Sequence, residues 1–412
     1  MDFQDVIDLC VKRRKELGLS QRDLAKICGF PQSVIGRFET HVNEPQLSNL
    51  LKIFKALDID VNAQNVEFDS DFPLKAAIDS SKKLTIGIFS PSSPISATVP
   101  IRYERGIEYL KSKGFNIIEG KLKGKREFYR SGSIKERAEE LNDLIHNDKV
   151  DIIMSSIGGN NSNALLPYID YEYLKKHPKM IVGYSDVTAV LLAIYAKTGL
   201  VTFYGPALAA SFGEFPPFVD ETYNYFTDIL DCKTPYIYKK PLFWTDEFIP
   251  WMEQNGPKEK YNNNWITVRE GVAEGRLIGG NLNTMEGFFG TEYMPEIKKG
   301  DILFIEDAQK NPSVIERSFS LLKNAGVFDK IGGLILGKHE KYDDFETNRK
   351  PHEILLEVLG DFNFPFLADV DCCHTHPMMT FPIGCRVKLD AAEQKITLLE
   401  NPIKKWRNSK SE

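Results

Sequence analysis

The chain has 412 residues, and this length predicts two or three domains rather than one. Hydrophobic residues make up 42% of the sequence and charged residues 27%, proportions that are typical of a globular protein. The formal net charge of −6 excludes a general attraction to nucleic acid or to anionic membranes, so any contact with DNA must be local.

No stretch of the sequence is long and apolar enough to span a membrane, and the acidic start Met1–Asp5 differs from a secretory signal. We therefore expect a cytoplasmic protein without a membrane partner. The six cysteines form no CxxC pair and no disulfide framework, which indicates reduced thiols.

Residues 1–66 are expected to form an all-α domain. A capping box at Ser20 predicts a helix over 21–28, Gly29 breaks it, and further helices are expected over 32–39 and 45–57. Two short helices joined by a glycine-containing turn are typical of a helix-turn-helix motif. The segment resembles the XRE-type DNA-binding family of Cro and the phage repressors.

This resemblance implies that the second helix of the motif enters the major groove of DNA. Its exposed positions Gln32, Ser33 and Arg37 would contact DNA, and Gln21 would face the backbone phosphates. Proteins of this kind bind paired half-sites as dimers, so we expect a homodimer. The alternative is a helical dimerisation module that no longer binds DNA.

Residues 67–83 are polar without periodicity and are expected to be a linker. Over 84–240, buried strands alternate with amphipathic helices, with strands expected at 84–89, 116–118, 151–155 and 179–182 and helices at 102–113 and 134–147. This alternation predicts an N-terminal α/β lobe with a parallel sheet covered by helices.

One turn in this lobe is a candidate active-site turn. An apolar run ends at Gly183, Ser185 follows, and a buried helix begins soon after. A serine at such a turn lies beside the free N–H groups of a helix start, where an acyl-transfer nucleophile would be placed. The alternative is that Ser185 only caps the helix.

A glycine pair, Gly158-Gly159, directly follows another strand of the lobe. No Lys-Ser or Lys-Thr follows it, so a Walker-type phosphate loop is not supported. Glycine lets the backbone approach a ligand closely, and an exposed N–H here could bind a developing oxyanion. The alternative is a tight turn with no chemical role.

Residues 241–268 are rich in aromatic side chains and are expected to be a connecting loop. Its aromatics are either packing anchors or a stacking surface for a flat ligand. For the second case we expect Trp251 to be the platform, with Trp244 and Trp265 as substitutes.

The C-terminal lobe, 269–405, contains two further groups of candidate residues. Glu306 and Asp307 end a buried strand, where an acid can orient a histidine or merely cap a helix. His374 and His376 lie in a later loop, but no third ligand at metal-binding spacing accompanies them, so no metal site is expected.

The chain order Ser185, Glu306, His374 occurs also in the α/β-hydrolases, but the G-x-S-x-G motif of those enzymes is absent. Six short segments instead resemble the LD-carboxypeptidase family of serine peptidases. They are Ser131–Arg137, Ser156–Gly159, Gly183–Asp186, Gly279–Leu282, Leu303–Asp307 and His374–Pro377.

The resemblance implies a two-lobed α/β and β-rich fold that uses no cofactor or metal. It implies Ser185 as the nucleophile, His374 as the base and Glu306 as the residue that orients it. The N–H groups of Gly159 and Asp186 would bind the oxyanion. A substrate-binding role is expected for Asn281.

Three longer strings, 158–163, 204–208 and 315–319, are similar to the branch of this family that contains the microcin C immunity protein. Members of that branch cut the amide between a C-terminal aspartyl residue and a nucleotide-like group. The other branch removes the terminal D-alanine from a murein tetrapeptide, which is one alternative. A second alternative is a transcriptional regulator whose peptidase-like lobe binds a peptide, murein fragment or peptidyl-nucleotide as its effector.

Overall fold

A computed structural model describes residues 3–40, 52–54, 56–57 and 83–403. The chain divides into two compact units, Met1–Ser80 and Ser81–Glu412. Within the described residues, no helix is long and apolar enough to cross a bilayer.

The first unit is helical, with α1 (Phe3–Glu16), α2 (Gln21–Cys28) and α3 (Gln32–Glu39). The capping box at Ser20 is present, since the Ser20 hydroxyl accepts the Asp23 N–H and the Asp23 carboxylate accepts the Ser20 N–H. Gly29 ends α2 in the left-handed region, with φ of 70°. The expected third helix over 45–57 falls largely outside the described residues. Within this range, the described residues 52–54 and 56 are helical.

A six-stranded sheet with the order β14-β5-β4-β3-β1-β2 forms the first lobe of the second unit. Its strands are β1 (Thr85–Phe89), β2 (Asn116–Glu119), β3 (Ile152–Ser155), β4 (Met180–Gly183), β5 (Thr202–Tyr204) and β14 (Phe381–Ile383). The pairs among β1 to β5 are parallel, and β14 runs antiparallel to β5.

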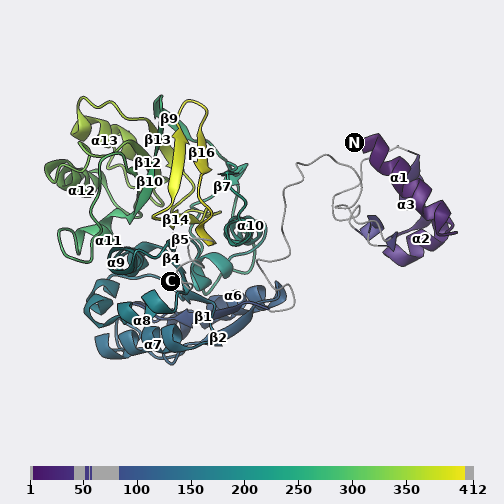
Figure 1. Ribbon diagram of the computed structural model, residues 1–412, viewed down its shortest axis with the longest axis horizontal. Coiled ribbons are helices and arrows are strands. Elements are labelled where there is room, and N and C mark those ends of the chain that lie inside the picture. The colour runs from purple at the N-terminus through teal and green to yellow at the C-terminus, as the bar shows by residue number, and fades with distance from the viewer. Residues whose placement is uncertain (1–2, 41–51, 55, 58–82, 404–412) are drawn as a thin grey trace. The chain divides into compact units, whose positions relative to one another are not determined.

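Helices cover both faces of this sheet. They are α5 (Ile95–Thr98), α6 (Pro100–Ser112), α7 (Ile134–His146), α8 (Tyr171–Lys176), α9 (Thr188–Thr198) and α10 (Phe218–Leu230). Figure 1 shows α6 on one side of β1 and β2 and α7 on the other. All residues of β1, β3, β4 and β5 are buried, which explains the unbroken apolar runs in the sequence.

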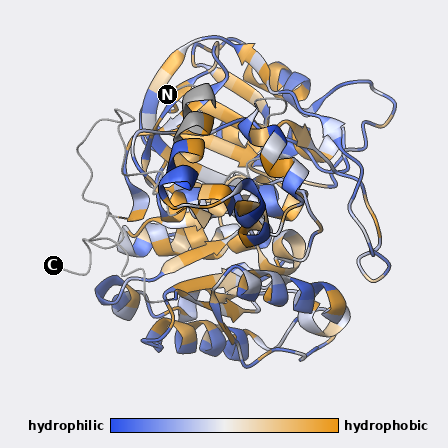
Figure 2. Cartoon of the chain, turned by 90° about the vertical axis from the view of Figure 1, so that its right-hand side faces the viewer, coloured by the Kyte–Doolittle hydropathy of each residue, from blue (hydrophilic) through white to orange (hydrophobic). Residues whose placement is uncertain are grey.

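An eight-stranded mixed sheet, in the order β6-β16-β15-β10-β11-β12-β13-β9, forms the second lobe. Its strands are β6 (Tyr236–Ile237), β9 (Ile266–Arg269), β10 (Val272–Asn281), β11 (Ile302–Glu306), β12 (Gly333–Gly337), β13 (Phe366–Val370), β15 (Arg386–Asp390) and β16 (Lys395–Leu398). Its helices are α11 (Leu282–Glu286), α12 (Pro312–Asn324) and α13 (Pro351–Leu359). In Figure 2 the strands of both sheets are mainly hydrophobic, whereas the helices carry many hydrophilic residues.

The chain crosses between the lobes more often than the sequence predicts. β14 belongs to the stretch assigned to the C-terminal lobe but joins the first sheet, and β6 belongs to the stretch assigned to the N-terminal lobe but joins the second. Residues 241–268 are also not a simple loop, because β7 (Phe243–Trp244) pairs with β8 (Tyr261–Asn262) and β9 begins within them. Pairing of such short strands depends on distant partners and leaves no periodicity in the local sequence.

The strand order of the first sheet indicates which edge can bind a ligand. On one side of β1 the chain leads to β2 and on the other to β3, β4 and β5, so the strand order reverses between β1 and β3. Open α/β sheets bind ligands beside such a switch point, outside the carboxyl ends of the strands. Ser92, Gly159 and Ser185 all follow strands that end at this edge.

Candidate active site

Ser185 lies in the sharp connection between β4 and α9. β4 ends at Gly183, a single 3-10 turn covers Ser185–Val187, and α9 begins at Thr188. The φ of Ser185 is 61°, a left-handed value that costs a non-glycine residue about 1–3 kcal/mol and is found mainly where function requires it. The Ser185 side chain is half-buried, whereas its neighbours on both sides are buried.

Ser185, His374 and Glu306 form a chain of hydrogen bonds across three separate elements. Ser185 Oγ lies 2.9 Å from His374 Nε2, and His374 Nδ1 lies 2.6 Å from Glu306 Oε2. Glu306 is the last residue of β11, and His374 lies in the loop after β13. A serine nucleophile is activated when its hydroxyl, an imidazole and a carboxylate are hydrogen-bonded in this order.

His376 lies away from this chain of hydrogen bonds. It is 6% exposed, and its Nε2 lies 3.8 Å from Glu214 Oε2, within a buried cluster that also holds Arg102 and Lys258. Burial, together with the nearby Lys258, holds the pKa of His376 well below its usual range. His376 is therefore a buried ring beside Glu214, and His374 is the histidine in contact with Ser185.

The acid and the base shift each other's pKa values. Burial opposes the charged imidazolium of His374, but the Glu306 carboxylate outweighs this effect and raises the pKa of His374. Burial likewise opposes the Glu306 carboxylate, but His374, Tyr204 and Asn281 outweigh it and lower the pKa of Glu306. The Glu306 side chain is fully buried and that of His374 is 16% exposed, so water screens this pair weakly.

Asn281 packs behind the acid. Its Nδ2 donates to Glu306 Oε1 at 2.9 Å, and its Oδ1 accepts the N–H of Thr284 at 2.9 Å as the cap of α11. It is 4% exposed, so both ends of its amide are engaged inside the protein. Contact of Asn281 with a substrate stays a prediction, and its role in the described structure is to hold Glu306.

The glycine pair after β3 passes directly beside the nucleophile. A Cβ on Gly158 would lie 2.9 Å from Ser185 Cβ and 3.2 Å from the backbone nitrogen of Asp186. Gly159 has φ of 150°, and a Cβ there would lie 2.3 Å from Ser92 Oγ. Both positions therefore require glycine, and the pair brings bare backbone to the turn that carries Ser185 and Asp186.

The side chain of Asp186 contacts the segment that follows the glycine pair. Its carboxylate accepts the N–H groups of Asn161 and Ser162 at 3.1 and 2.9 Å, which ties the glycine turn to the nucleophile turn. Burial raises the pKa of this carboxyl. The backbone N–H of Asp186 belongs to the first turn of a helical segment, where N–H groups have no intrahelical acceptor.

The three tryptophans proposed as stacking platforms have different surroundings. The Trp251 ring is half-buried, with the guanidinium of Arg102 4.6 Å from its centroid. Trp244 is half-buried and meets Tyr261 edge to face. Trp265 is 1% exposed and donates from Nε1 to Asp371, so it is a packing anchor and not a substitute platform.

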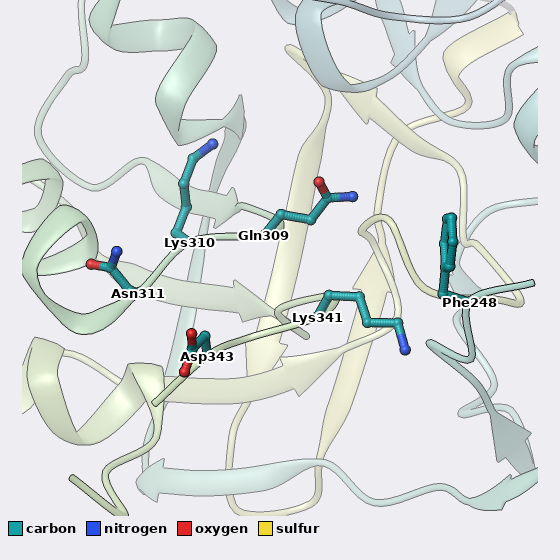
Figure 3. A pocket seen from close by; sticks show the side chains of 6 residues that line it. All are labelled: Phe248, Gln309, Lys310, Asn311, Lys341 and Asp343. Atoms are coloured by element: carbon teal, nitrogen blue, oxygen red, sulfur yellow. The ribbon is translucent and has the colours of Figure 1, made fainter. Parts of the chain in front are cut away.

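A hollow of about 380 Å³ opens at the loop that follows β11, and no expected site residue predicted it. It is lined by Phe248, Gln309, Lys310, Asn311, Lys341 and Asp343. Figure 3 shows Phe248 facing Gln309 and Lys341 across it. The position of Lys310, four residues after Glu306 at a strand end, was the available signal, but its partners come from two distant segments.

The residues expected to meet DNA lie on α2 and α3. Gln32, Ser33 and Arg37 are exposed on α3. Gln21 is half-buried, and its Nε2 donates to Glu39 Oε2 at 2.9 Å, so this amide links the two helices of the motif.

Among the residues that the structure describes, no group of three or more histidine, cysteine, aspartate or glutamate side chains could hold a metal ion.

Comparison with known proteins gives three matches to family models. The LD-carboxypeptidase N-terminal domain matches residues 86–205, the LD-carboxypeptidase C-terminal domain matches 274–389, and a helix-turn-helix model matches 12–63. The last of these agrees with the motif predicted from the sequence.

Several relatives match along nearly their whole length. A putative carboxypeptidase of Vibrio cholerae is 56% identical over 306 residues, which cover 74% of this chain and 92% of the relative. The microcin C7 self-immunity protein MccF of Escherichia coli is 52% identical over 320 residues, covering 77% and 93%. A solved structure of MccF in complex with aspartyl sulfamoyl adenosine matches with a TM-score of 0.75 and 52% identity, over 77% of this chain and 96% of that chain. The chain therefore belongs to the LD-carboxypeptidase family and is a serine-type carboxypeptidase that carries an N-terminal helix-turn-helix domain.

Proposed function

We propose that the protein hydrolyses the amide that joins a C-terminal acidic aminoacyl residue to a nucleotide-like group, with Ser185 as the nucleophile. The observation that carries this proposal is the hydrogen-bonded chain Ser185–His374–Glu306 beneath a strained turn. The structures of MccF with aspartyl sulfamoyl adenosine and with glutamyl sulfamoyl guanosine support the choice of substrate class.

In the proposed mechanism, His374 Nε2 takes the proton of Ser185 Oγ as that oxygen attacks the carbonyl carbon. The N–H groups of Gly159 and Asp186 bind the oxyanion, and Glu306 stabilises the imidazolium that forms. His374 then donates its proton to the leaving nitrogen, and an aminoacyl ester remains on Ser185. Water, deprotonated by His374, hydrolyses that ester and restores the enzyme.

The hollow at the loop after β11 suits the leaving group. Lys310 and Lys341 supply two positive charges for a phosphate-like group, and Phe248, which is 64% exposed, offers an aromatic face. The loop that carries Trp251 is joined to this region, because the Lys341 N–H donates to the Asp246 carboxylate. We assign base stacking to Trp251, as the sequence analysis predicts, and the phosphate to the two lysines.

We also propose that the N-terminal unit binds operator DNA as a homodimer in the cytoplasm. The exposed Gln32, Ser33 and Arg37 of α3 support this role, because the second helix of such a motif reads base edges. In this proposal the ligand of the peptidase lobes is also an effector of DNA binding, a role that is compatible with catalysis.

The test is turnover of an aspartyl-adenosine conjugate by the wild type and by Ser185→Ala. We expect the variant to lower kcat by at least about a thousandfold while the circular dichroism spectrum stays unchanged. Murein tetrapeptide is the competing substrate, since one relative of 28% identity is a probable murein peptide carboxypeptidase of Bacillus subtilis. Preferential release of D-alanine from that peptide would overturn the substrate assignment, and near-normal turnover by Ser185→Ala would overturn the nucleophile.

A further inference from the structure

Tyr204 touches both ends of the proposed catalytic machinery without being one of its three members. It is the last residue of β5, beside Gly183 of β4, and its side chain is fully buried. Its hydroxyl oxygen lies 2.5 Å from Glu306 Oε1 and 3.2 Å from the backbone nitrogen of Ser185. One side chain thus contacts the acid and the main chain of the nucleophile.

The hydrogen-bonding capacity of this phenol is committed to these two partners. A phenol has one O–H donor, and burial together with the neighbouring Glu306 raises the pKa of Tyr204 well above its usual range, so the proton stays on. The hydroxyl therefore donates to the carboxylate and accepts the N–H of Ser185. Because β5 belongs to the first sheet and β11 to the second, this hydroxyl bridges the two lobes at the site.

At the nucleophile, the contact holds a residue in an unfavourable conformation. Ser185 has φ of 61°, and such a backbone persists only where its surroundings hold it. If the phenol oxygen were removed, the Ser185 N–H would lose the acceptor that it has in the structure. The phenol thereby helps to fix the direction of Ser185 Oγ toward His374.

At the acid, the contact sorts the two carboxylate oxygens. Glu306 Oε1 accepts from Tyr204 and from Asn281, which leaves Oε2 directed at His374 Nδ1. Donors to Oε1 also favour the charged carboxylate, and the Tyr204 hydrogen bond contributes to lowering the pKa of Glu306. The basicity of the carboxylate, and with it that of His374, therefore depends on the phenol.

The geometry points to Tyr204 as a positioning residue that holds the nucleophile turn and the acid in register across the two lobes and sets the basicity of the His374–Glu306 pair. This inference rests on the proposed catalytic role of Ser185, His374 and Glu306. According to this inference, Tyr204 affects the pH dependence of the reaction although it is not one of the three residues Ser185, His374 and Glu306.

The test compares Tyr204→Phe with a matched control, Tyr238→Phe. Tyr238 is 2% exposed and its hydroxyl donates to the carbonyl of Thr380 at 2.8 Å, so the control loses the same kind of buried bond away from the triad. For Tyr204→Phe we expect kcat to fall by roughly tenfold to a hundredfold with KM changed less than about threefold. The acidic limb of kcat/KM should move to higher pH, because a carboxylate with one donor fewer holds the imidazolium proton more tightly.

Two further measurements keep the outcome decisive. The first replaces Tyr204 by 3-fluorotyrosine, whose more acidic phenol donates a stronger hydrogen bond to Glu306. The carboxylate then stabilises the His374 imidazolium less, so the acidic limb of kcat/KM should move to lower pH. This measurement also tests the inference if Tyr204→Phe does not fold. The rate at which a fluorophosphonate labels Ser185 reports the nucleophile without any choice of substrate, and it should fall in Tyr204→Phe and stay unchanged in Tyr238→Phe.

An unlabelled Ser185 in the wild type would contradict the proposed nucleophile itself. A labelled wild type with equal rates and equal pH profiles in Tyr204→Phe would overturn the role of Tyr204 alone. Equal losses in Tyr204→Phe and Tyr238→Phe, with no movement of the acidic limb, would reduce the phenol to an ordinary packing contact and would also overturn it.

Discussion

At the scale of single residues, the site combines a strained serine with a buried acid and base. Ser185 has a positive φ and lies beside Gly158, where an added Cβ would come within 2.9 Å of Ser185 Cβ. The Glu306 side chain is fully buried, and His374 and neutral donors stabilise its charge. This arrangement favours proton transfer from Ser185 to His374 once a carbonyl is bound.

The pH dependence of kcat/KM should follow His374. The base acts only when neutral, and Glu306 raises the pKa of His374, so the acidic limb should lie above about 6.5, the usual value for histidine. Glu306→Gln removes the charge that stabilises the imidazolium and should move the limb to lower pH while lowering kcat. His376→Ala is the control variant, and its acidic limb should stay where it is in the wild type. If the acidic limb of kcat/KM also stays in place in Glu306→Gln, a group other than His374 titrates.

The sequence could predict some of these residues and not others. The apolar run, the glycine and the following buried helix indicate a turn at Ser185 from local pattern alone. The choice of His374 over His376 needed the family resemblance, because two histidines one residue apart have the same local signals. The positions of Tyr204 and Asn281 against Glu306 depend on how two sheets meet, which no local pattern encodes.

At the scale of elements, strands with unbroken apolar runs were predictable and strands of two or three residues were not. The boundaries expected for β1, β2 and β3 differ from the observed ones by one residue. β1 and β3 are buried along their whole length, and β2 is half-buried apart from its exposed first residue. β7, β8 and β14 are too short to show a period. β7 and β8 pair with each other, and β14 pairs with β5, which lies far away in the chain. The sequence therefore predicts a loop over 241–268, where the structure has short strands.

Within that segment, the stacking role of Trp251 can be measured directly. Trp251→Ala should raise KM for an aspartyl-adenosine conjugate by roughly tenfold to a hundredfold with little change in kcat, since stacking remote from the amide binds ground and transition states alike. Trp244→Ala is the companion variant, because Trp244 is also half-buried. If both variants turn over the conjugate as well as the wild type does, the base does not stack on this segment.

At the scale of the whole molecule, the chain joins a helix-turn-helix unit to a two-lobed carboxypeptidase. The change from short helices to alternating strands and helices marked this division in the sequence. Motifs of a few residues predict the family of each part. The family models that match residues 12–63, 86–205 and 274–389 agree with this prediction. Whether a bound substrate alters DNA binding depends on both units acting in one chain, so the full chain is the object to test.

For the DNA-binding unit, Arg37→Ala should abolish a specific mobility shift on the protein's own upstream region. Arg37 is exposed on α3, where a side chain can reach base edges or phosphates. Lys12→Ala is the matched control, since Lys12 is exposed on α1 and loses the same charge. A wild type that binds every sequence equally weakly would indicate a helical dimerisation module instead.

The central claim is that Ser185 attacks the carbonyl of an acidic aminoacyl residue whose amide nitrogen belongs to a nucleotide-like group. The most direct measurement is rapid acid quenching of the enzyme with an aspartyl-adenosine conjugate, followed by mass spectrometry of the peptide that contains Ser185. We expect an aspartyl ester on Ser185 in the wild type and none in Ser185→Ala. Release of the nucleotide-like group at the normal rate by Ser185→Ala, or an ester on a different residue, would contradict the account.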